Sequence, residues 1–206
     1  MIVADSEARI FEKPVEGRHR ILLEAQPLFV ARGFNAVSMQ QIADAAGVNK
    51  ATLYHHFRDK EELFLEVVRG EIERATISMQ EVLRMEGSFR TRLLALTSSL
   101  FATTQIDYFR LIADLHEYVA EPRRVQLLEQ TPPPWKAIRP TIEQAIADGE
   151  IRPIPVELAI SFVFHAIFGQ VKLAKMDALA YPADDALAKL IVDLLMDGLS
   201  VPAKAP

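Results

Sequence analysis

The sequence predicts an all-α fold, and three observations lead to this prediction. Apolar residues recur at intervals of three and four positions along most of the chain, which is the spacing of one face of a helix. These runs are separated by glycine and proline, the residues that end or interrupt helices. No stretch alternates apolar and polar residues in the way that a half-buried strand does.

The first predicted helix follows a short arm, residues 1–15, that shows no sustained period and that we expect to be flexible. From Arg18 onward, apolar residues line one helical face up to Gly33, which can end the helix in the left-handed conformation. Pro27 lies inside this pattern. Its ring removes the hydrogen bond to the carbonyl of Leu23 and costs around 3 kcal/mol in a regular helix, so we expect a kink.

The next helix has a well-defined start. Ser38 and Gln41 have the spacing of a capping box, and Val37 and Ile42 occupy the two positions of a hydrophobic staple. Gly47 ends this helix after about two turns. The residue types therefore fix both ends of a short helix.

A second short helix, residues 50–56, is predicted to start at the cap residue Asn49, and a long helix follows. Asp59 and Glu62 form a second capping box at the start of that long helix. The outward positions of the second short helix hold Lys, Thr, Tyr and His instead of an apolar seam. Two short helices around a tight turn, with a polar second helix, are typical of a helix-turn-helix that binds DNA.

The charge distribution fits this interpretation. The net charge is −5, yet residues 18–60 contain six basic and three acidic residues. The acidic excess therefore lies in the rest of the chain. A basic end on an acidic body suggests that one end of the molecule meets phosphates.

The remainder of the chain also predicts helices. Their expected ranges are 89–104, 107–121, 123–130, 134–148, 155–175 and 184–199. The range 155–175 is apolar nearly all round, so we expect it to be buried on two sides.

We expect a cytoplasmic protein without a membrane partner. The N-terminus carries acidic residues before any long apolar run, which argues against a signal peptide. The most apolar stretch, Leu158–Val171, is shorter than the roughly 20 residues that span a bilayer. The absence of cysteine excludes disulfides and thiolate metal sites and fits a reducing compartment.

The N-terminal part of the chain resembles the TetR/AcrR family of bacterial transcriptional regulators. The residues that carry this resemblance lie between positions 18 and 68, namely Gly33-Phe34, Ser38, Ile42-Ala43, Ala46-Gly47-Val48, the run from Lys50 to Phe57, and Lys60-Glu61-Glu62-Leu63-Phe64. The resemblance implies an all-α homodimer, with an N-terminal three-helix helix-turn-helix domain at residues 16–60. It also implies a C-terminal helical ligand-binding and dimerisation domain at 61–206, whose last two long helices form a four-helix bundle with the partner.

The resemblance and the helix-turn-helix geometry together predict which residues contact DNA. They are Ser38, Met39, Gln40, Lys50, Ala51, Thr52, Tyr54, His55, His56 and Lys60. Lys50 and Thr52 stand early on the second helix, where side chains reach base edges, while Tyr54 and His56 match the family's phosphate-contacting pair. Lys60 lies in the first turn of a helix, a position that attracts anions. Ala51 and His55 depart from the family's common residues, which leaves the operator sequence open.

Two further sets of residues are predicted in the C-terminal domain. Candidates for a ligand pocket are Phe101, Tyr108, Phe109, Leu111, Leu115, His116, Trp135, Phe162 and His165. Candidates for the dimer interface are Phe164, Phe168, Leu187, Leu190, Ile191, Leu194 and Leu195. Aromatic residues at helical spacing can equally be plain core. The histidines lack the spacing of a metal site, so no metal and no cofactor are expected.

The function expected from these observations is a ligand-responsive transcriptional regulator, in the first place a repressor. It would bind a palindromic operator as a homodimer and be released by a small apolar or aromatic effector. Two alternatives remain open: a DNA-binding protein without a small-molecule inducer, and an all-α enzyme that uses the C-terminal pocket. The sequence contains no nucleophile elbow, phosphate-binding loop or zinc-protease motif that would favour the enzyme.

Overall fold

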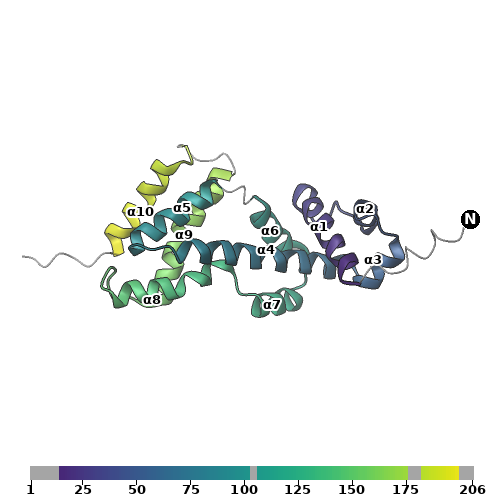
Figure 1. Cartoon of the computed structure of the whole chain (residues 1–206), viewed down its shortest axis with the longest axis horizontal. Helices are drawn as coiled ribbons and strands as arrows, with labels where there is room; N and C mark the ends of the chain where they lie inside the picture. The colour runs from purple at the N-terminus through teal and green to yellow at the C-terminus, as the bar shows by residue number, and fades with distance from the viewer. Residues whose placement is uncertain (1–13, 103–105, 176–181, 200–206) are drawn as a thin grey trace, which may run out of the picture. The chain divides into compact units, whose positions relative to one another are not determined.

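A computed structural model describes residues 14–102, 106–175 and 182–199, and every regular element in these ranges is a helix (Figure 1). The predicted all-α fold is thereby confirmed. The elements are α1 (Pro14–Arg32), α2 (Met39–Ala45), α3 (Lys50–His56), α4 (Lys60–Leu83), α5 (Phe89–Ala102), α6 (Ile106–Tyr118), α7 (Glu121–Gln130), η1 (Pro134–Ile138), α8 (Arg139–Ala147), α9 (Val156–Lys175) and α10 (Asp185–Leu199).

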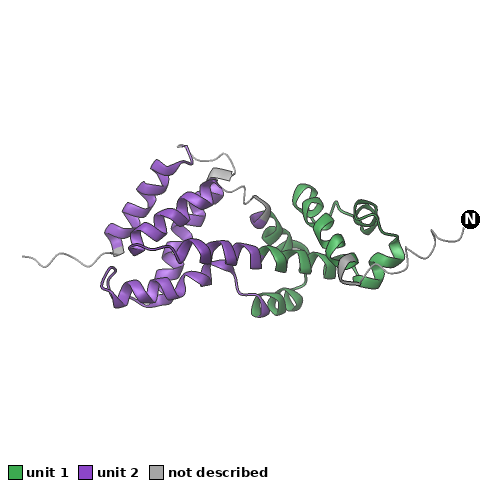
Figure 2. Ribbon diagram, in the orientation of Figure 1, with its two compact units in different colours: residues 1–71, 110–129 green, residues 72–109, 130–206 purple. Residues whose placement is uncertain are grey.

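The chain folds into two compact units (Figure 2). Unit 1 comprises residues 1–71 and 110–129, and unit 2 comprises residues 72–109 and 130–206. Helices α4 and α6 each contribute one part to each unit. These units divide the chain differently from the boundary expected after residue 60, because the start of α4 and most of α6 and α7 belong with the helix-turn-helix.

Helix α1 continues through Pro27 to Arg32, so the expected kink does not interrupt it. Proline cannot donate the hydrogen bond to the carbonyl of Leu23. The helix on either side of this missing hydrogen bond is nevertheless held in place, because Ile21, Ala25 and Phe29 are fully buried in unit 1. Tertiary packing thus keeps α1 a continuous helix through the proline at which a kink is expected.

The predicted caps of the helix-turn-helix are largely confirmed. The Gln41 N–H donates to Ser38 Oγ over 3.2 Å, and the Ser38 N–H donates to Gln41 Oε1 over 2.8 Å, which completes the capping box of α2. Asn49 Oδ1 accepts the Thr52 N–H over 2.7 Å at the start of α3.

The second expected capping box, at the start of α4, forms only in part. Asp59 Oδ1 accepts the Glu62 N–H over 2.7 Å, as predicted. The Glu62 carboxylate, however, accepts the N–H of Arg58 instead of that of Asp59, over 2.9 Å. The two carboxylates together still satisfy two backbone donors at this helix start.

The range 134–148, predicted as one helix, forms the short 3₁₀-helix η1 followed by α8. Pro140 explains the division, because it has no N–H to bond the carbonyl of Lys136. The N–H of Arg139 bonds that carbonyl instead, in the tighter pattern of a 3₁₀ turn.

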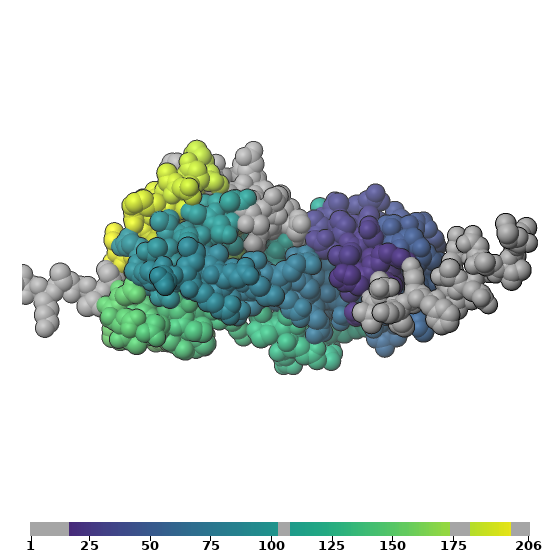
Figure 3. All heavy atoms as spheres, viewed as in Figure 1, coloured from purple at the N-terminus to yellow at the C-terminus, as the bar shows by residue number. Residues whose placement is uncertain are grey.

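Unit 2 is built around one apolar core formed by α5, α8, α9 and α10 together with part of α4. The central residues of α9, among them Ala159, Val163 and Ile167, are buried there. In Figure 3 the side chains of α4, α5 and α10 close over the spaces that the ribbons of this unit leave open.

By length and composition alone, Val156–Leu173 could cross a membrane, and one third of this segment is buried in the fold. The apolar stretch is therefore longer than the range Leu158–Val171 identified from the sequence. Such a helix is equally compatible with a core position, and its buried residues belong to the core of unit 2.

Candidate DNA-binding surface and effector cavity

Helix α3 presents most of its surface to solvent. Leu53 is its one fully buried residue and fixes the helix against unit 1. Lys50, Ala51, Tyr54 and His55 are exposed, and Thr52 is half-buried. A seven-residue helix with one buried side chain leaves its exposed side chains free to reach the groove of a DNA duplex.

Lys50 and Tyr54 lie one turn apart on this exposed face. The ammonium of Lys50 stands 5.7 Å from the centre of the Tyr54 ring, within the range of a cation–π contact. The phenol therefore steadies a long cationic side chain in front of the helix. This arrangement suits a lysine that donates to base edges next to a tyrosine that donates to a phosphate.

The start of α2 supplies fewer free groups than the sequence reading assumed. Met39 is buried, so its side chain belongs to the core and not to the surface. The Ser38 hydroxyl is engaged in the capping box. Gln40 is exposed and donates to Asp44 Oδ1 over 2.8 Å, a contact that it can exchange for a DNA acceptor.

His56 lies against the first turns of α1, at the end of α3. A Cβ atom at Gly17 would stand only 3.2 Å from His56 Nε2. The pKa of His56 is lowered, first by burial and then by the neighbouring charges of His55 and Arg18. The ring thus stands in locally positive surroundings, which an approaching phosphate would offset.

Lys60 has a task inside the protein that sequence reasoning missed. Its ammonium donates to the carbonyl oxygens of Phe34 and Val37, each over 3.0 Å, and lies 4.3 Å from the centre of the Phe34 ring. Burial lowers the pKa of this amine. Two of its donors therefore fasten the turn between α1 and α2, and one remains for a phosphate.

The second half of α6 and helix α7 complete unit 1. Asp114 Oδ2 accepts the backbone N–H of Phe34 over 2.6 Å, and Arg110 donates to the carbonyl of Ala31 over 3.3 Å. From α7, Arg123 pairs with Glu61 at 2.9 Å. The pocket candidates Leu111, Leu115 and His116 therefore lie in unit 1, the first two buried and His116 exposed.

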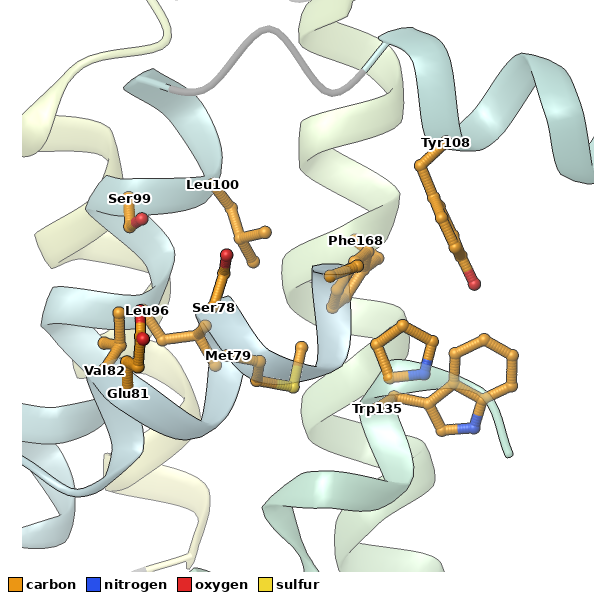
Figure 4. A pocket seen from close by; sticks show the side chains of 12 residues that line it. Ser78, Met79, Glu81, Val82, Leu96, Ser99, Leu100, Tyr108, Trp135 and Phe168 are labelled. Atoms are coloured by element: carbon orange, nitrogen blue, oxygen red, sulfur yellow. The ribbon is translucent and has the colours of Figure 1, made fainter. Parts of the chain in front are cut away.

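A cavity of about 260 Å³ opens in unit 2 between α4, α5, α6, η1 and α9. Figure 4 shows Tyr108, Trp135 and Phe168 along one side and Met79, Leu96 and Leu100 along another. Ser78, Glu81 and Ser99 also line the cavity and are exposed, so they mark its opening to solvent.

The cavity gathers only part of the predicted pocket. Tyr108 and Trp135 line it, as expected, and so does Phe168, which was assigned to the dimer interface. Phe101 is buried in the core of unit 2, and Phe109 packs against that core. The cavity-lining residues of α4 and α5 were not predicted, because the sequence pattern does not show which side of either helix faces a cavity.

Phe162 and His165 lie on the outer face of α9 and not in the cavity. Both are exposed, and His165 Nδ1 lies 2.7 Å from the carbonyl oxygen of Ser161 one turn earlier. Leu158 is exposed on the same helix. The expectation that α9 is buried on two sides takes a dimer partner for one of them, and a single chain covers only the other.

The predicted dimer residues divide into two groups. Leu190 and Leu194 of α10 are 55% and 67% exposed, which is unusual for leucines in a helix of a folded domain. Ile191 and Leu195 are buried in the core of their own chain, while Phe164 and Leu187 are partly buried against it. Large apolar side chains of α9 and α10, namely Leu158, Phe162, Leu190 and Leu194, are thus left exposed on unit 2 by a single chain.

Within the described residues, no group of three or more histidines and acidic residues could hold a metal ion. The described surfaces offer hydrogen-bond donors on α3 and an apolar cavity in unit 2.

Comparison with known proteins agrees with the geometry of α1 to α4. The sequence model of the family described as "Bacterial regulatory proteins, tetR family" matches residues 21–67, which contain the helix-turn-helix. The repressor KstR2 of Rhodococcus jostii is 28% identical over 191 residues, which cover 90% of this chain and 93% of that protein. The chain belongs to the TetR family. Members of this family are transcriptional regulators that bind operator DNA, and they are not enzymes.

Two further matches define how far the TetR-family likeness extends. The activator FasR of Mycolicibacterium smegmatis is 37% identical over 110 residues, which span about half of each protein, 52% of this chain and 50% of FasR. A TetR-family transcriptional regulator from Mesorhizobium loti has the same fold, with a TM-score of 0.75 and 21% identity. This match covers 93% of this chain and all of that one. The relatives include both repressors and an activator.

Proposed function

We propose that this TetR-family protein is a ligand-responsive repressor. In this proposal two copies bind a palindromic operator through α3, and a small apolar or aromatic effector in the cavity of unit 2 releases the DNA. A regulator of this kind works in the cytoplasm, where the chromosome is. The single observation that carries the effector part of the proposal is a solvent-open cavity of about 260 Å³ in the unit that does not contain the helix-turn-helix.

The operator contacts follow from exposure and chemistry. The amine of Lys50 and the amide of Gln40 are exposed and can donate to base edges. The phenol of Tyr54 and the imidazole of His56 can donate to phosphates. Ser38, Ala51, Thr52 and His55 stand close enough in sequence to contribute from the same two helices. Lys60 can add one donor to a phosphate while two others hold the turn between α1 and α2.

The homodimer is supported by the outer face of unit 2. Leu158, Phe162, Leu190 and Leu194 leave large apolar side chains in solvent on the two helices that the resemblance assigns to the dimer. Covering them with a second copy removes this surface from water and gives about 25 cal/mol for each Å² buried. A two-fold axis also matches a palindromic operator, whose half-sites lie about one helical turn apart.

The apolar character of the effector is supported by the walls of the cavity. Nine of the twelve lining residues, from α4, α5, α6, η1 and α9, are apolar or aromatic (Figure 4). The name of one relative supports this, since KstR2 from Mycobacterium tuberculosis is described as a ketosteroid transcriptional regulator. The repressor direction follows KstR2, which is named a repressor, whereas FasR is named an activator.

The proposal can be tested by measuring operator release. An operator is first isolated by selection from random DNA, and release is then screened with apolar small molecules by fluorescence anisotropy. Ala75→Phe places a large side chain in the cavity and is expected to abolish release while operator affinity stays within about twofold, since Ala75 lies in unit 2. Ala147→Phe, on the exposed side of α8, is the matched control and should respond like the wild type.

A regulator without a small-molecule inducer is the second candidate. A cavity fully filled by side chains would favour it, and the open cavity of unit 2 does not. If Ala75→Phe and the wild type behave alike with every compound that releases the operator, the cavity has no part in release and this second candidate gains support.

A further inference from the structure

Among the described residues, none of those that line the cavity of unit 2 is basic. Its ionisable lining residues are Glu81, at the exposed edge, and Tyr108, whose side chain is buried. The sequence from Leu93 to Phe109, which supplies the α5 and α6 walls, contains no lysine, arginine or histidine. Arg74 precedes the lining residue Ala75 on α4 but is not itself part of the lining.

This absence of basic groups has a direct energetic consequence. A carboxylate or phosphate that leaves water for an apolar site loses several kcal/mol of solvation unless a cation or several N–H donors replace the water. None of the lining side chains that the structure describes supplies a cation. Glu81 adds a negative charge at the opening, so an entering anion is repelled before it is desolvated.

Tyr108 supplies the polar group that fits such a ligand. It is only 7% exposed, and burial alone raises the pKa of its phenol far above the usual value. The phenol therefore stays protonated and can donate a hydrogen bond to a neutral acceptor. Figure 4 shows its hydroxyl end on the side of the cavity where Trp135 lies.

Trp135 contributes a flat wall next to this hydroxyl. Its ring lies 4.5 Å from the ring of Phe164, which in turn lies 4.6 Å from Phe168. Trp135 and Phe168 line the cavity and Phe164 packs against both rings, so the two lining rings form a supported aromatic surface against which a rigid apolar body can lie. A dry cavity of about 150 Å³ holds benzene, so about 260 Å³ suits a compact bicyclic or tricyclic molecule.

We propose that the effector is an uncharged, compact apolar molecule whose polar group, a ketone, ester or ether oxygen, accepts a hydrogen bond from Tyr108, and that the cavity rejects the corresponding carboxylate. This inference rests on the proposed function, in which the cavity is the effector site. It adds the charge, the size and the polar group of the ligand.

The experiment uses Trp135, the only tryptophan of the chain, as the reporter of cavity occupancy. Its fluorescence is titrated in the full-length protein with three probes of matched size and shape that do not absorb where tryptophan is excited. They are adamantyl methyl ketone, adamantanecarboxylate and adamantyl-ethylammonium. The ketone is expected to bind at least about tenfold more tightly than the carboxylate, because the ketone is uncharged whereas the carboxylate brings an unpaired charge into the cavity.

Two variants test the residues that carry the argument. Glu81→Lys should improve binding of the carboxylate at least about threefold and leave the ketone unchanged, whereas Glu73→Lys, also on α4 but outside the lining, should change neither. Tyr108→Phe should weaken the ketone about fivefold and leave the hydrocarbon ethyladamantane unchanged, which a general disturbance of the cavity would not do.

The outcomes separate the two proposals. Carboxylate or ammonium binding as tight as that of the ketone overturns the inference, and so does a titration in which no probe alters Trp135 fluorescence. Release of the operator is measured in parallel. If the ketone binds selectively but the operator is never released by any cavity ligand, the ligand chemistry stands and the proposed repressor mechanism fails.

Discussion

The carboxylate of Asp114 accepts a 2.6 Å hydrogen bond from the backbone N–H of Phe34, although the two residues are 80 positions apart in the chain. Phe34 follows Gly33, which ends α1 in the left-handed conformation with φ at 80°. A Cβ atom at Gly33 would meet the side chains of Arg110 and Asp114 at 3.3 Å. The end of α1 is therefore held by α6 within unit 1, and this contact has measurable consequences.

Asp114→Asn should lower the free energy of unfolding by about 1–2 kcal/mol. The substitution replaces a charged acceptor of a partly buried N–H by a neutral one of similar shape, and such bonds contribute about 1.5–3 kcal/mol when the acceptor is ionised. Urea denaturation monitored by circular dichroism measures the change. Glu129→Gln, at an exposed position of α7, is the control and should stay within about 0.5 kcal/mol of the wild type. Equal stability of the two variants would contradict the assigned bond.

Lys60→Met should affect both stability and DNA binding. Loss of the two bonds to the carbonyls of Phe34 and Val37 is expected to cost about 1–2 kcal/mol of stability, since the ammonium is only partly buried. If its third donor also meets a phosphate, the slope of log affinity against log salt should fall by about one. Lys136→Met, an exposed lysine of unit 2, should change neither quantity. An unchanged stability would refute the structural role.

Lys50→Ala should alter which operator is preferred, while Tyr54→Phe should weaken binding to all sequences alike. Lysine donates to base edges and therefore carries sequence information, whereas a phenol on a phosphate only positions the protein. Selection from random DNA, followed by affinity measurements on the winning sites, distinguishes the two effects. The same selected motif for Lys50→Ala and the wild type would show that Lys50 does not read bases.

The stability of the protein should fall as the pH drops through the range in which His56 titrates. Its pKa in the folded chain is lowered from the ordinary value of 6.5, by burial first and by His55 and Arg18 next. As the pH falls below 6.5, the unfolded chain takes up a proton at this site before the folded chain does, so protonation favours unfolding until the pH has passed the lowered pKa of the folded chain. His56→Gln should therefore lose part of the decrease in unfolding free energy between about pH 7 and 5, measured by denaturation. His19→Gln, an exposed histidine of α1, should keep the full decrease.

Leu194→Glu should convert the proposed dimer into a monomer. The side chain is 67% exposed in the single chain, so a charge there disturbs no buried contact of the protomer but would be forced into an apolar interface. Light scattering after size exclusion gives the mass of each variant. Leu23→Glu, at a similarly exposed leucine of α1, should leave the mass unchanged. A Leu194→Glu protein that still forms dimers would place the interface elsewhere.

The sequence predicted best those features that depend on residues close together in the chain. Ser38 with Gln41, and Asn49 with Thr52, form caps whose partners lie three residues apart, so their chemistry can be read directly. The role of Lys60 could not be read in this way. The carbonyls that it binds lie 23 and 26 residues earlier in the chain. Every residue has a backbone carbonyl, so the sequence does not show which ones a distant lysine binds.

The orientation of α9 was the other feature beyond the reach of the sequence. Phe162 and Phe164 are two positions apart and so point about 200° away from each other, one into solvent and one against Trp135. Because this helix is apolar nearly all round, its pattern does not tell which side meets the core. Only the packing of α5, α8 and α10 decides this, and with it the separation of cavity residues from the outer face.

The side chain of His56 limits which residues can replace Gly17 in α1. In a helix, alanine is preferred over glycine by roughly 1 kcal/mol, so helix propensity alone favours replacement of Gly17 by alanine. The ring of His56 leaves a new Cβ only 3.2 Å of room, so the gain in helix propensity would be offset by displacement of that ring. If His56 contacts the operator as proposed, substitutions at Gly17 would change operator binding without any contact between residue 17 and DNA, and a mutational survey would mark it as a DNA-binding position.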